Sequence, residues 1–161
     1  MNFRMITLAL FFIVINCFEL KAQNIFEQRI WEVGGRKKSV FLDQGIFHTG
    51  KREGKSVLSA VRHSYVTRNG FERVVFDFNT NEIPQVYGHA NSKEKKVYVD
   101  FFNTRANPSL SSFGNSKFVK QLNFFPIDEN MLSVELDLKE EVLVDVFYLK
   151  NPGRLVIDIK K

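Results

Sequence analysis

The side chains that could perform chemistry in this 161-residue chain are few and widely spread. His48, His63 and His89 are the three histidines, and none of them shares a ligand spacing such as His-x-x-x-His. A hydrolytic zinc site needs several His and carboxylate ligands around one ion, because the ion must lower the pKa of its bound water. The sequence therefore predicts neither a metal site nor a cofactor.

Other catalytic signatures are matched only in part. The segment from Gly50 to Ser56 resembles a phosphate-binding loop, but three residues separate its two glycines where that loop has four. No Gly-x-Ser-x-Gly nucleophile elbow occurs. Ser, His and Asp residues could still meet in space as a triad, which a sequence does not reveal. We expect a protein without enzymatic activity.

Four aspartates recur in one apolar setting, at Asp77, Asp100, Asp137 and Asp158. Paired carboxylates can act as general acid and base in glycoside hydrolysis. Here each aspartate alternates with apolar residues, which places it on the face of a strand opposite the core. A carboxylate at such a position stays solvated or meets a cross-strand Arg or Lys. We therefore interpret the four aspartates as structural.

Strands must position these aspartates, and the stretch from Arg73 to Phe78 is the clearest of them. Apolar side chains at every second position give the period of a strand that covers a core on one side. Turn signals such as Thr67-Arg68-Asn69-Gly70 separate the segments. The pattern predicts eight strands, at residues 57–65, 73–78, 85–89, 97–101, 118–125, 132–138, 142–149 and 155–159.

The strands fall into two similar halves. Asp77 and Asp137 are 60 positions apart (137 − 77), and Asp100 and Asp158 are 58 apart (158 − 100), which indicates an internal repeat. Two four-stranded halves with one apolar face each can bury those faces against each other. We predict an all-β fold, a β-sandwich of about eight strands. Its expected core is Val74, Phe76, Phe78, Val97, Val99, Phe101, Leu132, Val134, Leu136, Leu155, Ile157 and Ile159.

The start of the chain has the layout of a signal peptide. A positive residue, Arg4, precedes a short apolar run and a polar region that ends at Ala22, so residues 1–22 predict export with cleavage after Ala22. The only cysteine, Cys17, ends a segment similar to a bacterial lipobox, and its lipidation is the alternative. Residues 23–56 are interpreted as an extension with a Gly-rich linker from Asp43 to Ser56, and residues 57–161 as the folded domain.

Three segments resemble the AMIN domain, a module of periplasmic N-acetylmuramoyl-L-alanine amidases and pilus secretins. They are Gly70 to Phe78, Val97 to Thr104 and Pro152 to Ile159, in the order and spacing of that family. Lys96 departs from the family, in which an Arg often opens that strand. The resemblance implies two packed β-sheets and a non-catalytic module that directs a protein to the cell envelope by binding peptidoglycan. It implies a periplasmic location, or a membrane-anchored lipoprotein if Cys17 is lipidated.

Basic side chains are the candidate ligand-binding residues. The chain carries a net charge of +5 and has a pI near 9.4, which favours an anionic partner. Arg62, Arg105, Lys117 and Lys120 lie on or beside the predicted strands, and Arg can hold the carboxylates of peptidoglycan stem peptides in bidentate fashion. The alternative is that these charges only keep the protein soluble. Export argues against nucleic acid, and the rival function is an adaptor that docks on a secretin, divisome or other envelope protein complex.

Overall fold

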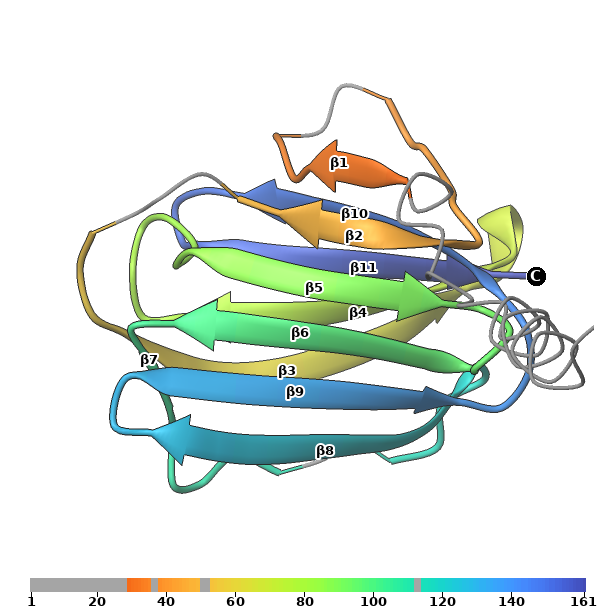
Figure 1. Ribbon diagram of the computed structural model, residues 1–161. Coiled ribbons are helices and arrows are strands. Elements are labelled where there is room, and N and C mark those ends of the chain that lie inside the picture. Colours follow the sequence, from red (N-terminus) through yellow and green to blue (C-terminus); the bar gives the residue numbers. More distant parts are fainter. Residues whose placement is uncertain (1–28, 36–37, 50–52, 112–113) are drawn as a thin grey trace, which may run out of the picture.

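Two β-sheets pack face to face, so the chain is an all-β sandwich (Figure 1). The computed structural model describes residues 29–35, 38–49, 53–111 and 114–161. The predicted leader, Cys17 and Ala22 lie outside the described residues. The first sheet has six strands, in the order β1 (Ile30–Glu32), β2 (Gln44–His48), β5 (Val86–Asn91), β6 (Lys96–Phe102), β9 (Met131–Leu138) and β8 (Val119–Asp128).

The second sheet has five strands, in the order β10 (Leu143–Leu149), β11 (Arg154–Lys160), β4 (Phe71–Phe78), β3 (Ser56–Val66) and β7 (Thr104–Ala106). Neighbouring strands are antiparallel except for β1 with β2 and β3 with β7. A 3-10 turn at Thr67–Asn69 joins β3 to β4, and Gly70 follows it in the left-handed region at φ 67°. The turn signal in the sequence thus matches a real hairpin.

All eight predicted strands are present, and three further short strands, β1, β2 and β7, lie outside them. One of these, β2, lies inside the segment interpreted as a linker, so that interpretation is wrong for Gln44–His48. Its Phe47 is fully buried. A Cβ on Gly88 would lie 2.1 Å from the Phe47 ring, so the missing side chain of β5 makes room for this phenylalanine. Isolated residues of the chain before β2 also reach the edge strand β10, where Leu42 pairs with Val144.

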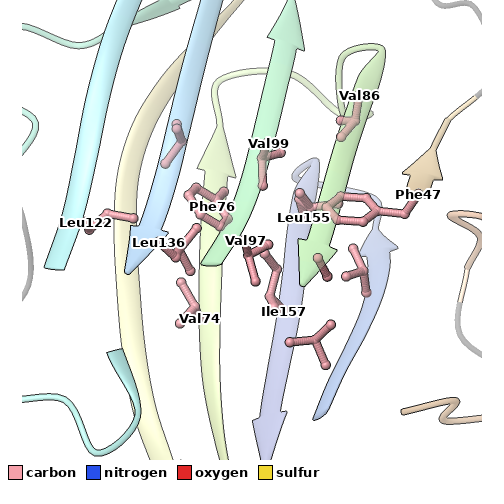
Figure 2. Packing of buried hydrophobic residues seen from close by; sticks show 14 of the residues in the cluster. Phe47, Val74, Phe76, Val86, Val97, Val99, Leu122, Leu136, Leu155 and Ile157 are labelled. Atoms are coloured by element: carbon pink, nitrogen blue, oxygen red, sulfur yellow. The ribbon is translucent and has the colours of Figure 1, made fainter. Parts of the chain in front are cut away.

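The core lies between the sheets and contains all twelve predicted residues, each no more than 3% exposed. Figure 2 shows Val74 and Phe76 of the five-stranded sheet facing Val97, Val99 and Leu136 of the six-stranded sheet. The ring centroids of Phe76 and Phe101 lie 5.5 Å apart, within the usual range for aromatic pairs. The period-2 alternation therefore gave the correct face of each strand.

The two halves of the sequence are equivalent in topology, but neither half forms a sheet by itself. The first half supplies the β3–β4 hairpin to one sheet and the β5–β6 hairpin to the other, and the second half does the reverse. The central pairs then have the same register: Val74 pairs with Ile157 in β4–β11, and the equivalent Val134 pairs with Val99 in β6–β9. The sandwich is therefore two interlocked repeats related by pseudo-twofold symmetry.

Even the irregularities of the strands are repeated. A bulge separates Leu58 from Ala60 in β3 opposite Phe78 and Asp77, and an equivalent bulge separates Val119 from Gln121 in β8. A bulge increases twist and bends the strand that carries it. Both bulges lie on strands next to the central pairs, so the repeat fixes the curvature of the two sheets in the same way.

Candidate functional site

Arg62 of β3 forms a bidentate pair with Asp77 of the neighbouring strand. Its Nε and Nη2 atoms donate to the two carboxylate oxygens at 2.6 and 2.7 Å, and these hydrogen bonds raise the pKa of Arg62. The Arg62 side chain is 60% exposed, so the pair contributes only about 0.2–1 kcal/mol to stability. The candidate residue Arg62 is thus bound by Asp77, the aspartate that the sequence analysis had placed on the outer face of its strand.

Lys117 lies two residues before β8, and Lys120 is the second residue of that strand. Lys117 Nζ lies 3.0 Å from the Tyr65 hydroxyl and 4.2 Å from the centroid of the Tyr65 ring, a cation–π contact between the segment before β8 and the end of β3. Lys120 occupies the bulge of β8 and is exposed. Neither lysine lines a cavity among those found in the described part of the chain.

Arg105 of β7 is held by the turn between β8 and β9. Its Nε donates to the main-chain carbonyl oxygen of Glu129 at 2.8 Å, and its Nη2 to the Glu129 carboxylate at 3.0 Å. The Arg105 side chain is 57% exposed and that of Glu129 is 86% exposed. The hydrogen bond to the main-chain carbonyl does not depend on the carboxylate, so it can hold the Arg105 guanidinium when the Glu129 side chain turns away.

Arg105 borders a groove of about 250 Å³ at one end of the sandwich. Asn79 lies across it and accepts a hydrogen bond from Val57 N at 2.7 Å, which fixes the amide at the rim. Asn103 adopts a left-handed conformation at φ 52° in the tight connection from β6 to β7. Three amide side chains, two basic residues and a carboxylate surround the groove, which is lined by Lys55, Ser56, Val57, Asn79, Asn103, Arg105, Glu129 and Asn130.

The structure does not gather the four candidate residues into one site. Arg105 lies beside Val57 at the beginning of β3, whereas Lys117 contacts Tyr65 at its end. Eight strand positions separate these points, about 26 Å at the usual rise per residue. Arg105 alone lines the groove. The Asn103-Thr104 segment before it was the sequence signal, whereas nothing in the sequence connected Asn79, Glu129 or Asn130 with Arg105.

Three of the four repeated aspartates meet a basic residue, as predicted: Asp77 pairs with Arg62, Asp137 with Lys96 and Asp158 with Arg73. Asp158 is fully buried rather than solvated, and two hydrogen bonds from Arg73 at 2.7 and 2.9 Å satisfy it. Lys96 also bonds Glu135, and the two carboxylates raise its pKa.

A Ser, a Glu and a His meet at the other end of the sandwich, but the serine and the histidine contact the carboxylate and not each other. Glu72 is buried between them: Ser116 Oγ donates to Oε2 at 2.8 Å, and His63 Nδ1 lies 3.0 Å from Oε1. A nucleophilic serine needs a base beside its hydroxyl. Here the serine donates to the carboxylate, and the histidine contacts the far oxygen, so these residues form a structural clamp.

The main-chain N–H groups of Lys117 and Phe118 complete this clamp, at 3.2 and 2.7 Å from the Glu72 carboxylate. Burial acts to raise the pKa of Glu72, but the hydrogen bonds from Phe118, Ser116, His63 and Lys117 outweigh it and hold the pKa below its usual range. The clamp fixes the entry to β8 at the beginning of β4.

The remaining histidines lie away from this clamp, on two neighbouring strands and on the same face of the six-stranded sheet. His48 lies at the end of β2 and His89 in the middle of β5, both half-buried. Within the described residues, no three His, Cys, Asp or Glu side chains gather in a way that could hold a metal ion. No helix in this part of the chain is long and apolar enough to cross a membrane. Residues 50–52 of the segment that resembles a phosphate-binding loop lie outside the described ranges.

Comparison with known proteins gives no relative. No protein-family model matches the chain, and no curated protein matches its sequence. The AMIN resemblance therefore depends on the sequence motifs alone. The fold alone therefore defines the class of this protein, a β-sandwich of two interlocked repeats.

Proposed function

We propose that the protein is a non-catalytic, exported module of the bacterial cell envelope that binds peptidoglycan. The observation that carries this proposal is the groove at Arg105, which is lined by this hydrogen-bonded arginine together with three asparagines. Peptidoglycan combines carboxylates on its stem peptides with amides and hydroxyls on its sugars. Arg binds carboxylates in bidentate fashion, and Asn side chains both donate to and accept from amides and hydroxyls.

The electrostatics of the groove fit such a ligand. Lys55 and Arg105 supply two positive charges against the single carboxylate of Glu129, which is the most exposed member of its ion pair. A ligand carboxylate can replace that of Glu129 on Nη2 while the main-chain carbonyl continues to hold Nε. The AMIN-like motifs and the signal-peptide layout add the envelope location to the proposal.

Co-sedimentation with purified peptidoglycan sacculi tests the proposal. We expect the mature protein to pellet with sacculi, and Arg105→Ala to weaken binding by about tenfold, the effect of one charge-assisted contact. Arg62→Ala is the matched control, since Arg62 is equally exposed and paired but lies outside the groove. If the two variants pellet equally, the groove is not the binding site. If the mature protein stays in the supernatant at low salt, peptidoglycan is not its ligand.

A second measurement separates binding from catalysis. Sacculi incubated with the protein, with and without added zinc, should release no muropeptides, because the described side chains form neither a nucleophile–base pair nor a metal site. Release above that of a heat-denatured sample would overturn the non-catalytic assignment.

A further inference from the structure

The outer face of the six-stranded sheet carries a row of four side chains from four adjacent strands. Tyr87 of β5 pairs with Asp100 of β6, Asp100 with Ser133 of β9, and Ser133 with Phe125 of β8. Residues paired across neighbouring strands project from the same face, and we call these four residues the Asp100 row. Tyr87 and Phe125 at its ends are each 45% exposed. The row spans three strand spacings, about 14 Å.

The internal repeat shows what the equivalent row does on the other sheet. Asp100 is equivalent to Asp158, and Ser133 to Arg73, in the shared register of the two central pairs. Arg73 gives both donors of its guanidinium edge to Asp158. Its Cζ atom also lies 5.3 Å from the ring centroid of Phe71 and 5.5 Å from that of Phe147. The five-stranded sheet thus satisfies its outer aspartate with an arginine of its own.

On the six-stranded sheet that arginine is absent. Ser133 occupies its place, and the Asp100 carboxylate forms no hydrogen bond or ion pair with any side chain or main-chain group that the structure describes. Met131 is equivalent to Phe71, and His89 to Phe147, so the positions that flank Arg73 are filled here by side chains with apolar or flat surfaces. The short serine leaves the half-exposed Asp100 carboxylate without the guanidinium that Arg73 supplies at the equivalent position of the other sheet.

The charge of this face also differs from that of the molecule. Its outward side chains on β6 and β9 include three carboxylates, Asp100, Glu135 and Asp137, against one lysine, Lys96, which already bonds the latter two. The whole chain carries a net charge of +5. A local acidic surface on a basic protein attracts cationic groups and disfavours the anionic partner proposed for the groove.

We propose that the Asp100 row is a docking surface for a partner protein, which inserts an arginine side chain onto Asp100 between Tyr87 and Phe125. The partner supplies from outside the residue that Arg73 supplies within the five-stranded sheet. Arginine fits better than an ammonium group, because the geometry at Asp158 is bidentate and planar aromatic rings stack on a guanidinium. This surface is separate from the Arg105 groove and goes beyond the proposed function.

Nuclear magnetic resonance of the ¹⁵N-labelled mature protein tests the proposal with two probes, the blocked peptide Ac-Gly-Arg-Gly-NH₂ and its citrulline analogue. Citrulline has the shape of arginine without the charge. We expect the arginine peptide to shift the amide signals of Tyr87, Asp100, Ser133 and Phe125. Asp100→Asn should weaken this binding about tenfold or more, the usual effect of losing a charge-assisted pair.

Ser133→Arg is the sharper variant, because it places on β9 the equivalent of Arg73 and so should close the surface from within. We expect it to abolish the shifts while the protein stays folded, and Glu94→Gln, in the exposed turn before β6, to leave them unchanged. Equal shifts with the citrulline peptide, or full binding by Ser133→Arg, would overturn the proposal.

A muropeptide with a free stem-peptide amine is the third arm of the experiment. If it shifts the same four amides more strongly than the arginine peptide, and if Asp100→Asn also releases the protein from sacculi, the surface belongs to peptidoglycan and the docking proposal is wrong. If Arg105→Ala no longer pellets with sacculi but the arginine peptide still shifts the amide signals of the Asp100 row, the result bears on the groove proposal only. The two proposals therefore fail by different observations.

Discussion

The two central strand pairs, β4 with β11 and β6 with β9, are built from equivalent segments in the same register, yet they differ in how they satisfy their charges. In the first pair, Arg73 and the buried Asp158 neutralise each other. In the second pair, Asp100 is paired with Ser133, and its carboxylate has neither a hydrogen bond nor an ion pair with the described residues. The apolar inner faces of the two pairs remain equivalent. A duplicated fold thus keeps its core and register, while the outer faces are free to diverge.

We propose that this difference gives the two positions separate roles. The buried, paired charges of Arg73 and Asp158 contribute to folding, because each partner removed leaves an uncompensated charge. On the six-stranded sheet Lys96 is paired with Glu135 and Asp137, whereas the half-exposed Asp100 side chain contributes little to folding and is the proposed docking position. Exchanging residues between equivalent positions tests this division directly, since every substitution introduces a side chain that the fold already accepts in the other half.

Arg73→Ser introduces into the first half the serine that the second half has at Ser133, and it should have the largest effect on stability. It leaves the fully buried Asp158 without its guanidinium, and we expect the free energy of unfolding to fall by about 3 kcal/mol, the lower end for a broken buried pair because Arg73 itself is 31% exposed. Urea denaturation at neutral pH measures it. Arg62→Ser, which breaks an exposed pair, should cost less than about 1 kcal/mol. Similar losses in both variants would contradict the division of roles.

Glu72→Leu is the second exchange, because Leu132 occupies the equivalent position in the other half. The change leaves the Ser116 hydroxyl and the N–H groups of Lys117 and Phe118 without their acceptor, and apolar burial offsets only part of this. We expect a loss of about 2 kcal/mol at pH 7.

The pH dependence of stability identifies the cause. Because the pKa of Glu72 is lower in the folded protein than in the unfolded chain, its contribution is fully present above the unfolded value of about 4.3 and is lost as the pH falls through the folded value. The free energy of unfolding, measured by urea denaturation at each pH from 7 to 3, should therefore fall more with decreasing pH in the wild type than in Glu72→Leu. An equal fall in both proteins would show that the clamp does not depend on the charge of Glu72.

Gly88→Val is the third exchange and concerns the added strand β2. Val146 occupies the equivalent position of the second half, where no Phe47 packs. A side chain at Gly88 collides with the Phe47 ring, so we expect a loss of about 1–2 kcal/mol from overpacking, measured by thermal unfolding. In a Phe47→Ala background the same substitution should cost less or stabilise the protein. An equal cost in both backgrounds would mean that the two side chains do not compete.

Ser133→Arg should have the smallest effect on stability and is the complement of the first exchange. The new guanidinium can pair with Asp100 on a half-exposed surface, which adds at most about 1 kcal/mol. A double-mutant cycle with Asp100→Asn isolates that contribution. The gain should disappear in the double variant, and an unchanged gain would show that the arginine acts without Asp100.

Much of the fold could be predicted from the sequence, because alternation with period 2 is a local signal. Eight strands, the twelve core residues from Val74 to Ile159 and the duplication all follow from it. The three missed strands are short, with three, five and three residues, and they gain their order from neighbours rather than from their own pattern. β2 was missed because its glycine and polar residues resemble a linker, whereas Phe47 is buried through contact with Gly88.

The candidate site was predictable only in part. Arg105 was identified because a basic residue follows the Asn103-Thr104 segment, and the structure places it at the groove. Arg62 and Lys117 were equally plausible in the sequence, but they contact Asp77 and Tyr65 away from the groove, whereas Arg105 lines the groove together with its partner Glu129. Charge and composition do not show which basic residue borders a groove, since that depends on which strands become neighbours.

The sequence by itself determined the eight longer strands, which face of each enters the core, and that the chain contains two repeats. Strand faces depend on neighbours two positions apart and the repeat on a constant spacing of similar segments, so both can be read along the chain. The tertiary structure alone decided that the halves interlock rather than form one sheet each. That pairing brings Arg73 to Asp158, 85 residues away, and leaves Asp100 beside Ser133. The charges that differ between the repeats therefore acquire their roles only when β4 meets β11 and β6 meets β9.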